Sequence, residues 1–344
     1  MKGIVCLSPE RLELREMEEP ELQEGRAIVS IRRIGVCGTD LHAYRGRQPY
    51  FSYPRILGHE LAGVLESVPA GVTEWKAGDQ VSVIPYLHCG DCGACRSGKT
   101  NCCSHMQVLG VHADGGMTER ISVPMEHLIS ADTLSLDEAA LLEPLSIGAH
   151  AVRRSGIMPG QRALVIGAGP IGLGVMAFAR LAGAEVIAMD VQPDRLKFCK
   201  SWADVEHTVL AGEDVLTKLT CILDQNLPDV VFDATGNAQS MMSAFDYTAH
   251  GGTLVYVGLV KGEITFQDPE FHRRELTLMG SRNATREDFE RVIQAIQSKE
   301  LDVSRLITHR TRFEHITTEF EQWLQPGVIK AMIERNESGG GKVK

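Results

Sequence analysis

The spacing of hydrophobic and polar residues changes at about residue 160. Before about Arg120, short β-like runs such as 27–31 and 81–84 are broken by Gly, Pro and Asp. Interrupted runs of this kind are typical of an irregular, mostly antiparallel β domain. We therefore expect the first part of the chain to fold into such a domain.

After Gly160 the pattern predicts alternating strands and helices. The apolar runs 162–166 and 185–190 predict buried strands on either side of a helix over 171–181, and further strands are expected at 229–233, 252–257 and 276–280. This alternation predicts a parallel sheet with helices on both faces. From about Arg286 onwards the pattern predicts helix again.

The two parts are joined by a predicted helix over 136–154. Ser135 is a suitable N-cap, and Asp137 and Glu138 follow in the first turn. Glu143-Pro144 lies near its middle, so the helix is expected to be interrupted there.

Length and charge limit the classes of function. A chain of 344 residues is expected to form roughly two domains. The net charge of -10 and the absence of a Lys/Arg block longer than two residues argue against nucleic acid or an anionic membrane as partner and favour a small molecule. The charged stretch 10–21 is unlike a signal peptide, so a cytoplasmic location is expected.

A glycine-rich turn lies between the predicted strand 162–166 and the helix that follows it. Gly167, Gly169 and Gly172 form a G-x-G-x-x-G pattern, which in this context favours dinucleotide binding. Asp190 ends the next strand, where a carboxylate can accept the ribose hydroxyls of NAD and repel the 2′-phosphate of NADP. Arg195 is a solvated helix residue or a partner for an adenosine phosphate. The predicted cofactor-binding residues are Gly167, Gly169, Pro170, Ile171, Gly172, Asp190, Arg195, Thr235, Gly258 and Ser281.

Five of the nine cysteines lie between residues 89 and 103. The spacing C-x2-C-x2-C-x7-C of Cys89, Cys92, Cys95 and Cys103 predicts a closed, four-thiolate structural zinc site. The sequence leaves open whether Cys102 or Cys103 is the fourth ligand.

A second group of ligands comes from two separated loops. Cys37, His59 and Glu60 supply a thiolate, an imidazole and a carboxylate, the parts of an open catalytic zinc site. Thr39 and His42 lie beside Cys37, and Glu143, at the interrupted helix, can reach a metal or its water. Each residue alone would be read as an ordinary core or loop residue; it is their combination that points to metal-assisted alcohol chemistry.

These motifs occur in the order found in zinc-dependent medium-chain dehydrogenases. The chain resembles that superfamily over essentially its whole length, and Glu143-Pro144-Leu145 resembles its polyol and threonine dehydrogenase branch. The segment 48–60 is similar to the L-galactonate/L-gulonate 5-dehydrogenase group. One departure is Pro69, which replaces a glycine usually found in a turn.

The resemblance implies an α/β fold with two domains. A GroES-like irregular β catalytic domain would comprise residues 1–146 and 284–344, and a doubly wound parallel-sheet Rossmann domain, residues 147–283, would bind NAD. A homo-oligomer, dimer or tetramer, is also implied.

The resemblance also implies roles for single residues. Cys37 and His59 would hold the catalytic zinc, with Glu60, Glu143 or both completing its shell. Thr39, His42 and Glu60 are the expected catalytic residues, with Thr39 taking the substrate proton and His42 passing it on. The implied reaction is reversible hydride transfer from a secondary alcohol of a sugar acid to NAD.

Two other functions stay open on the sequence. One is a neutral polyol or L-threonine dehydrogenase on the same scaffold, and the other is a catalytically silent structural or ligand-binding homologue. A sugar acid needs a partner for its carboxylate, for which the candidates are Arg45, Arg47, Arg282 and Asn283.

Overall fold

The computed structural model describes residues 1–48, 50–325 and 327–335. The chain divides into two compact units, Met1–Glu143 with Val303–Lys344, and Pro144–Asp302. The segment 284–302, which the sequence assigned to the catalytic domain, lies in the second unit, and residues 336–344 lie outside the described part. The domain boundaries drawn from the resemblance stay a prediction.

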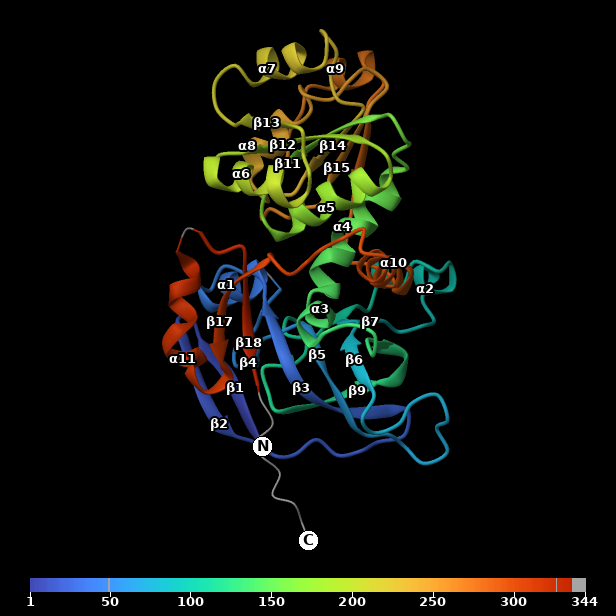
Figure 1. The fold of residues 1–344 in the computed structure, drawn as a ribbon, viewed down its shortest axis with the longest axis vertical. Coiled ribbons are helices and arrows are strands. Elements are labelled where there is room, and N and C mark those ends of the chain that lie inside the picture. Colours follow the sequence, from blue (N-terminus) through green and yellow to red (C-terminus); the bar gives the residue numbers. More distant parts are fainter. Residues whose placement is uncertain (49, 326, 336–344) are drawn as a thin grey trace. The chain divides into compact units, whose positions relative to one another are not determined.

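The first unit is built mainly of short strands (Figure 1). The strands are β1 (Lys2–Ser8), β2 (Arg11–Glu16), β3 (Arg26–Val36), β4 (Arg55–Ile56), β5 (Glu60–Ser67), β6 (Gln80–Val83), β7 (Tyr86–Leu87), β8 (Gln107–Val108), β9 (Arg120–Pro124), β10 (Leu128–Ser130), β17 (Ile307–Arg312) and β18 (Lys330–Glu334). The helices are α1 (Gly38–Tyr44), α2 (Gly93–Arg96), α3 (Leu136–Ala140) and α11 (Ile316–Glu319), with single 3₁₀ turns η1 (Thr100–Cys102), η2 (Met125–His127), η3 (Phe313–His315) and η4 (Phe320–Leu324).

The main sheet of this unit has the strand order β10-β6-β5-β3-β18-β17, with β9 also paired to β3. Among the described strands of the unit, β17 and β18 form the one parallel pair. The expected mostly antiparallel β domain is therefore confirmed. Its core includes the buried side chains of Ile31, Leu61 and Phe313.

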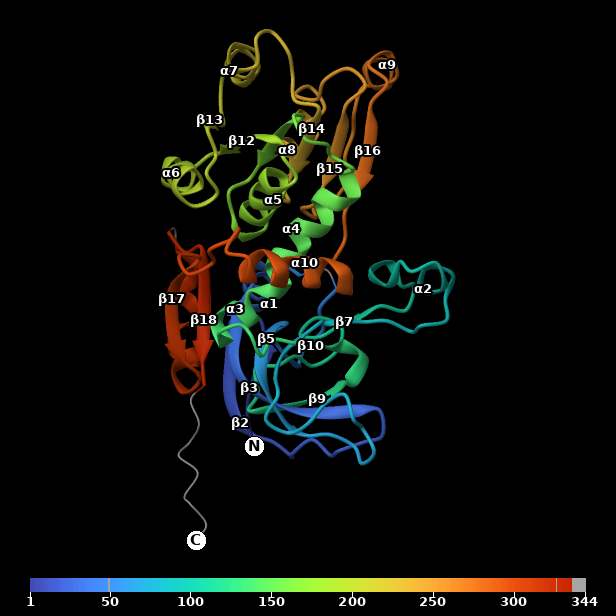
Figure 2. The same ribbon diagram turned by 45° about the vertical axis from the view of Figure 1, so that its right-hand side comes forward.

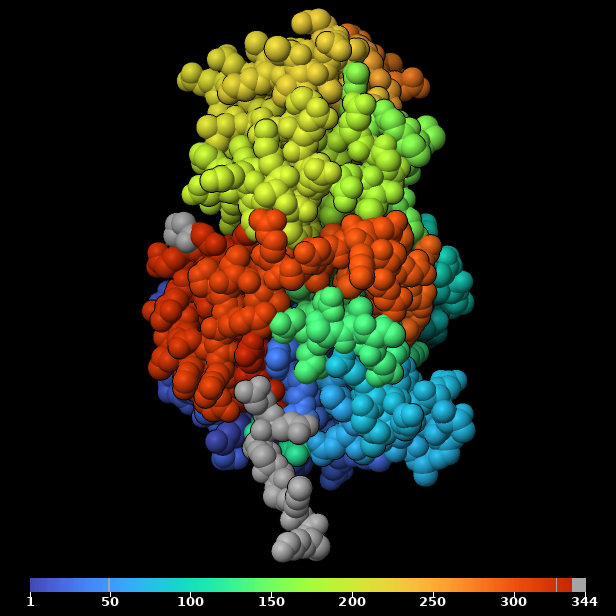
Figure 3. All heavy atoms as spheres, in the orientation of Figure 1, coloured from blue at the N-terminus to red at the C-terminus, as the bar shows by residue number. Residues whose placement is uncertain are grey.

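Strands β17 and β18 correct the expectation that the chain after Arg286 is helical. The helix α10 (Arg286–Gln297) is present, but β18 pairs antiparallel with β3 and β17 lies at the edge of the same sheet. In the space-filling view the red-coloured residues 303–325 and 327–335 lie along one side of the first unit (Figure 3). The partner of β18, strand β3, lies about 300 residues away in sequence, and β17 pairs in turn with β18; pairing over such a separation leaves no local pattern.

The helix predicted over 136–154 is divided at a different place from the one expected. Ser135 caps α3, where its Oγ accepts a hydrogen bond from the Glu138 amide at 3.2 Å. The break falls at Leu141, and α4 (Leu142–Ser155) begins next to it, so Pro144 lies in the first turn of α4. Proline is tolerated there because the first amides of a helix have no partner within the helix.

The second unit contains a six-stranded, all-parallel sheet of order β13-β12-β11-β14-β15-β16. Its strands are β11 (Arg162–Ile166), β12 (Glu185–Asp190), β13 (His207–Leu210), β14 (Val230–Asp233), β15 (Thr253–Tyr256) and β16 (Thr277–Gly280). Numbered along the chain, this order is 3-2-1-4-5-6, that of a dinucleotide-binding sheet. The predicted parallel sheet is confirmed, and β13 is the strand that the sequence did not reveal.

Helices connect these strands. They are α5 (Pro170–Leu181), α6 (Pro193–Trp202), α7 (Val215–Ile222), α8 (Ala238–Ser243) and α9 (Asp268–Arg273). Figure 2 shows β14, β15 and β16 side by side, with α9 at the start of β16. A core that includes Leu164, Ile187 and Leu254 lies within this unit. No helix in the described part of the chain is long and apolar enough to cross a membrane.

Candidate active site and cofactor site

Two loops of the first unit bring the predicted catalytic ligands together. Cys37 is the N-cap residue of α1, and His59 and Glu60 lie at the start of β5. One ligand atom from each of these three residues lies within 4.8 Å of the other two. His59 and Glu60 are buried and Cys37 is partly exposed, so the group is reachable from one side.

Asp40 links these two loops. Its Oδ2 accepts a hydrogen bond from the Cys37 amide at 2.9 Å, and its Oδ1 accepts one from the Gly58 amide at 3.1 Å. The same Oδ1 lies 3.7 Å from Nδ1 of His59. This fully buried carboxylate thus fixes the backbone on both sides of the ligand group.

Lys330 provides the counter-charge for Glu60. The Nζ atom of Lys330, at the start of β18, lies 2.5 and 2.8 Å from the two carboxylate oxygens of Glu60. The side chain of Glu60 lies over Gly35 on the paired strand β3. A Cβ atom on Gly35 would collide with the carboxylate of Glu60. Burial alone would lower the pKa of Lys330, but the negative charges of Glu60 and Cys37 raise it.

Glu143 is the fourth acidic or thiol group of this region. It is buried, and its Oε1 accepts a hydrogen bond from the hydroxyl of Tyr86. Burial raises the pKa of Glu143 to about 7, with His59 opposing that rise and Glu60 adding to it. Glu143 is outside the compact group formed by Cys37, His59 and Glu60.

The donor set fits a zinc ion. Nδ1 of His59 is buried without a hydrogen-bond partner. Burial would lower the pKa of His59, but Asp40 and Cys37 raise it well above its usual range, so the site favours a positive charge. Sulfur, imidazole and carboxylate are zinc ligands, and three protein ligands leave a position open.

The predicted proton carriers lie on α1. Thr39 is partly exposed and His42 is exposed, three residues apart on the helix and hence on neighbouring turns of one face. Partial burial and the positive charges of Arg47 and Arg45 lower the pKa of His42. Arg45 and Arg47 are exposed just after the helix.

The four predicted lobe cysteines also form one group. The ligand atoms of Cys89, Cys92, Cys95 and Cys103 all lie within 4.8 Å of one another. Cys102 is exposed and is not among them, so the geometry selects Cys103. Figure 2 shows the loop that carries α2 projecting from the body of its unit.

Backbone amides point at these sulfur atoms. The amides of Cys89 and His105 each donate to Sγ of Cys103 at 3.3 Å. Amides of Cys95 and Ser104 lower the pKa of Cys92 to about 5. Amide-to-sulfur hydrogen bonds stabilise thiolates, and four thiolates fit a closed tetrahedral zinc site.

In the second unit the glycine-rich turn has the geometry of a phosphate-binding turn. Gly167, which follows β11, has a positive φ of 96°. Gly169 is the N-cap of α5, and Pro170 opens that helix. A Cβ atom at Gly172 would collide with the carbonyl of Gly167, so glycine is needed for this close packing. Ile171 follows in the first turn, and the free amides of α5 suit an anion.

Asp190 lies at the end of β12, next to this turn. Its two oxygens accept hydrogen bonds from the amides of Ala168 at 2.7 Å and Gln192 at 2.8 Å. Asp190 therefore also holds the turn in place. A guanidinium nitrogen of Arg195 lies 3.5 Å from where a Cβ of Gly169 would be, so Arg195 reaches the same turn.

The other predicted cofactor residues follow the later strands. Thr235 comes after β14, where its amide and hydroxyl donate to Asp233, and Gly258 lies close against Gly236. The hydroxyl of Ser281 and the side-chain nitrogen of Asn283 are buried without hydrogen-bond partners. Such atoms fit a polar ligand at this edge of the sheet. Arg282 lies between them and is exposed.

Sequence reasoning gave no role to Asp40, Lys330, Tyr86 or Asp233. Lys330 had a local signal, because it is a single cation within the apolar run 328–333 and lysine is almost never fully buried unless paired. Asp233 resembles Asp190 in ending a buried strand. Asp40 and Tyr86 gave no signal beyond their nearness to predicted ligands.

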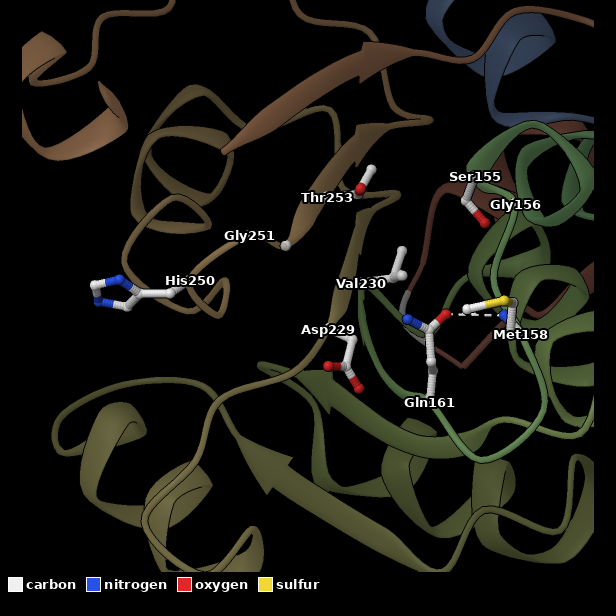
Figure 4. Close-up of a pocket in the computed structure, with 10 residues that line it drawn as sticks. Ser155, Gly156, Met158, Gln161, Asp229, Val230, His250, Gly251 and Thr253 are labelled. Carbon is white, nitrogen blue, oxygen red and sulfur yellow. Dashed lines mark hydrogen bonds between the residues drawn. The ribbon is translucent and has the colours of Figure 1, made fainter. Parts of the chain in front are cut away.

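A small cavity lies at the amino ends of the strands of the parallel sheet, opposite the end that carries the glycine-rich turn (Figure 4). Its volume is about 230 Å³, and Gln161, Asp229 and Thr253 line it where β11, β14 and β15 begin. The ring of His250 points away from Gln161 and Asp229 in Figure 4. Ligands of such sheets bind at the carboxyl ends of the strands, so this cavity is not the predicted cofactor site.

Comparisons with known proteins agree with this architecture. Residues 23–133 match the alcohol dehydrogenase GroES-like domain, and residues 170–298 match the zinc-binding dehydrogenase family. The L-galactonate-5-dehydrogenase of Escherichia coli (strain K12) is 43% identical over 322 residues, which cover 94% of this chain and 95% of that protein. The chain belongs to the zinc-dependent medium-chain alcohol dehydrogenase family.

Two further proteins illustrate the range of the family. The sorbitol dehydrogenase of Bacillus subtilis (strain 168) is 31% identical, with 94% of each chain covered. An alcohol dehydrogenase from Escherichia coli CFT073, solved in complex with NADH, has a TM-score of 0.91 at 28% identity and covers 97% of this chain, with 99% of its own length matched.

The family settles the class of activity. The protein is a zinc-dependent oxidoreductase that acts on a CH–OH group with a nicotinamide dinucleotide. The expected GroES-like and Rossmann-like parts are confirmed, and the alternative of a catalytically silent homologue is set aside.

Proposed function

We propose that this enzyme oxidises the C5 hydroxyl of L-galactonate or L-gulonate with NAD as hydride acceptor. The observation that carries the proposal is the 43% identity to L-galactonate-5-dehydrogenase across 94% of the chain. The other named relative, sorbitol dehydrogenase, is 31% identical over an equal share of the chain.

Cys37 and His59 would hold the catalytic zinc, with Glu60 or Glu143 as the third protein ligand. When bound, zinc supplies Lewis-acid activation of the alcohol, and NAD supplies the acceptor for hydride. Asp40 holds the two ligand loops together, because its carboxylate accepts one backbone hydrogen bond from each loop. Cys89, Cys92, Cys95 and Cys103 would hold the structural zinc.

Thr39 and His42 supply the path for the substrate proton in this proposal. Thr39 would accept the substrate proton at its hydroxyl oxygen while releasing its own hydroxyl proton, and His42 would help to pass that released proton towards solvent. Their positions support these roles, because Thr39 is the less exposed of the two and His42 faces water. The lowered pKa of His42 keeps the imidazole neutral near pH 7 and able to accept a proton.

The second unit would bind the dinucleotide with its pyrophosphate at the start of α5 and its ribose at Asp190. Asp190 is buried at the end of β12, and a carboxylate at this position disfavours the extra phosphate of NADP. Thr235, Gly258 and Ser281 lie after the strands β14, β15 and β16, where the nicotinamide half of the cofactor would run.

The substrate carboxylate requires a positive partner. Arg45 and Arg47 are exposed close to His42, and Arg282 with Asn283 follows β16. A guanidinium group can bind a carboxylate through two parallel hydrogen bonds, which a neutral polyol could not form. Arg45 or Arg47 in the first unit, and Arg282 or Asn283 in the second, are therefore the candidates for a contact that distinguishes a sugar acid from sorbitol or L-threonine.

A substrate panel tests the proposal. We expect NAD reduction with L-galactonate or L-gulonate, and much less with sorbitol, xylitol or L-threonine; activity confined to the polyols or threonine would refute the sugar-acid assignment. Cys37→Ser should abolish turnover of every substrate while NAD still binds. Cys6→Ala, which changes a buried cysteine outside both ligand groups, should retain turnover.

Assembly and location are part of the same proposal. We propose that the enzyme is a cytoplasmic homo-oligomer, dimer or tetramer, as the resemblance to bacterial polyol dehydrogenases implies. Light scattering on the purified enzyme measures the number of subunits, and a monomer at working concentration would contradict this part.

A further inference from the structure

A third group of metal-binding side chains lies outside the two predicted zinc sites. His88, Glu126 and His127 each offer one ligand atom, and these atoms lie within 4.8 Å of one another. The two imidazole rings are 4.9 Å apart between centroids and are inclined at 60°. Nε2 of His127 lies 3.7 Å from Oε1 of Glu126.

The three residues come from two segments that the fold holds firmly. His88 follows β7 directly and precedes Cys89, the first cysteine of the lobe. Glu126 and His127 lie in η2, where the carbonyl of His127 accepts a hydrogen bond from the Ile84 amide at 2.8 Å. A metal ion bound to all three residues would therefore connect the base of the lobe to the end of the main sheet.

The chemistry of the group suits a borderline divalent metal. Two imidazoles and one carboxylate form a set that zinc, nickel and copper bind well and that magnesium and calcium bind poorly. Three protein ligands leave further positions for water. The side chain of Glu126 is 65% exposed and that of His127 only 2%, so an ion can enter from solvent on the Glu126 side.

We propose that His88, Glu126 and His127 form a third zinc-binding site, separate from the catalytic group and from the four-cysteine lobe. A zinc ion bound there links the lobe to η2 and stabilises this corner of the first unit by mass action. The alternative is that His88 and His127 only pack against each other. Such packing would require neither the carboxylate of Glu126 nor ligand atoms of all three residues so close together.

Zinc binding to the full-length, zinc-loaded enzyme tests this site. After dialysis against excess Zn²⁺ we expect three zinc ions per chain in the wild type and two in both His88→Gln and Glu126→Gln. Glu206→Gln is the matched control, because Glu206 lies 3.8 Å from Nε2 of His207 in an exposed pair that has no second imidazole. This control should keep all three ions.

Affinity for the third ion adds a second measurement. Loss of one ligand should weaken it by more than about tenfold, since even outer-shell changes weaken metal sites by that much. Two ions in the wild type would overturn the proposal, as would a third ion that survives in both variants. If His88→Gln also loses the lobe zinc, Glu126→Gln decides, because its side chain lies largely in solvent.

Discussion

Lys330 and Glu60 form a buried ion pair directly beside the predicted catalytic zinc ligands. Nζ of Lys330 lies 2.5 Å from Oε1 and 2.8 Å from Oε2 of Glu60, and both side chains are almost fully excluded from solvent. If Glu60 is the third zinc ligand, as proposed, the ammonium group of Lys330 and the metal would compete for its carboxylate. Lys330 is a positioning residue in this arrangement, because it acts on the metal site through Glu60.

Lys330→Met should reveal that competition. In the metal-depleted enzyme the substitution leaves Glu60 buried without its counter-charge, which should lower the free energy of unfolding by about 3 kcal/mol. In the zinc-loaded enzyme the loss should be smaller, because the metal can take over as partner for Glu60. Urea unfolding of both forms measures the difference.

The double variant Lys330→Met/Glu60→Gln separates the pair from simple packing. Removing both charges should recover part of the stability that Lys330→Met loses, since no buried charge then lacks a partner. An equal loss with and without zinc, with no recovery in the double variant, would show that Lys330 matters only through its volume.

The second prediction concerns Asp190 and the choice between NAD and NADP. Asp190→Ala should lower kcat/KM for NAD by about tenfold or more, the effect of losing a hydrogen bond to a charged group. NADP should be used better relative to NAD. Because Asp190 also accepts the amides of Ala168 and Gln192, some affinity should be lost for both cofactors.

Arg195 is expected to determine how far Asp190→Ala shifts the preference from NAD to NADP. Its guanidinium lies beside Gly169, so we expect it to contact a 2′-phosphate once the carboxylate is removed. The variant Asp190→Ala/Arg195→Ala should therefore lose the gain for NADP. Asp194→Ala, in the exposed first turn of α6, is the control and should leave the NAD to NADP ratio unchanged.

The cysteine lobe gives a third prediction with a control supplied by the chain. Cys103→Ser removes a sulfur that accepts two backbone amides and contacts Cys89 at 3.5 Å. It should release one zinc ion and make the loop sensitive to protease. Cys102→Ser, at the exposed neighbouring position, should keep the zinc and resist protease like the wild type. The opposite result would make Cys102 the ligand.

The structure also shows which features local sequence could predict. β11 and β12 were predicted with their observed bounds because strands buried on both faces are continuous apolar runs. The glycine pattern and the cysteine spacing are local too, so the turn at Gly167 and the lobe followed from sequence. β17 and β18 did not, because their place depends on β3 at the other end of the chain.

The catalytic group shows the same limit. Cys37, His59 and Glu60 could be proposed from their types and spacing, but Lys330 reaches Glu60 across 270 residues of sequence. Asp40 is visible in the motif, yet its two backbone hydrogen bonds exist only after both loops have folded together. Side-chain partners that depend on long-range pairing require the structure.

A buried network in the second unit gives the last prediction, which concerns acid stability. Asp288, at the start of α10, forms a 2.9 Å hydrogen bond with Nδ1 of His150 and accepts bonds from Arg153 at 2.7 and 3.0 Å. Its carboxylate also accepts the amide and hydroxyl of Thr285. Burial alone would raise the pKa of Asp288, but His150 and Arg153 outweigh it and hold the pKa below its usual value.

A lowered pKa means that the ionised carboxylate of Asp288 is stabilised in the folded protein relative to the unfolded chain. The resulting stability is present above the unfolded pKa of about 4 and is lost as the pH falls through the folded value. Asp288→Asn should therefore lower the Tm near pH 7 by about 6–12 °C, which corresponds to about 3 kcal/mol for a buried ion pair. Below about pH 4 the difference from wild type should shrink.

Glu287→Gln provides the comparison for this experiment. Glu287 lies 3.1 Å from the same Arg153 but is exposed, so its loss should change stability by no more than about 1 kcal/mol at any pH. Thermal unfolding of the three proteins from pH 3 to 8 measures both effects. A Tm difference for Asp288→Asn that stays constant over this range would show that shape, and not the charge of Asp288, stabilises the junction of α4 and α10.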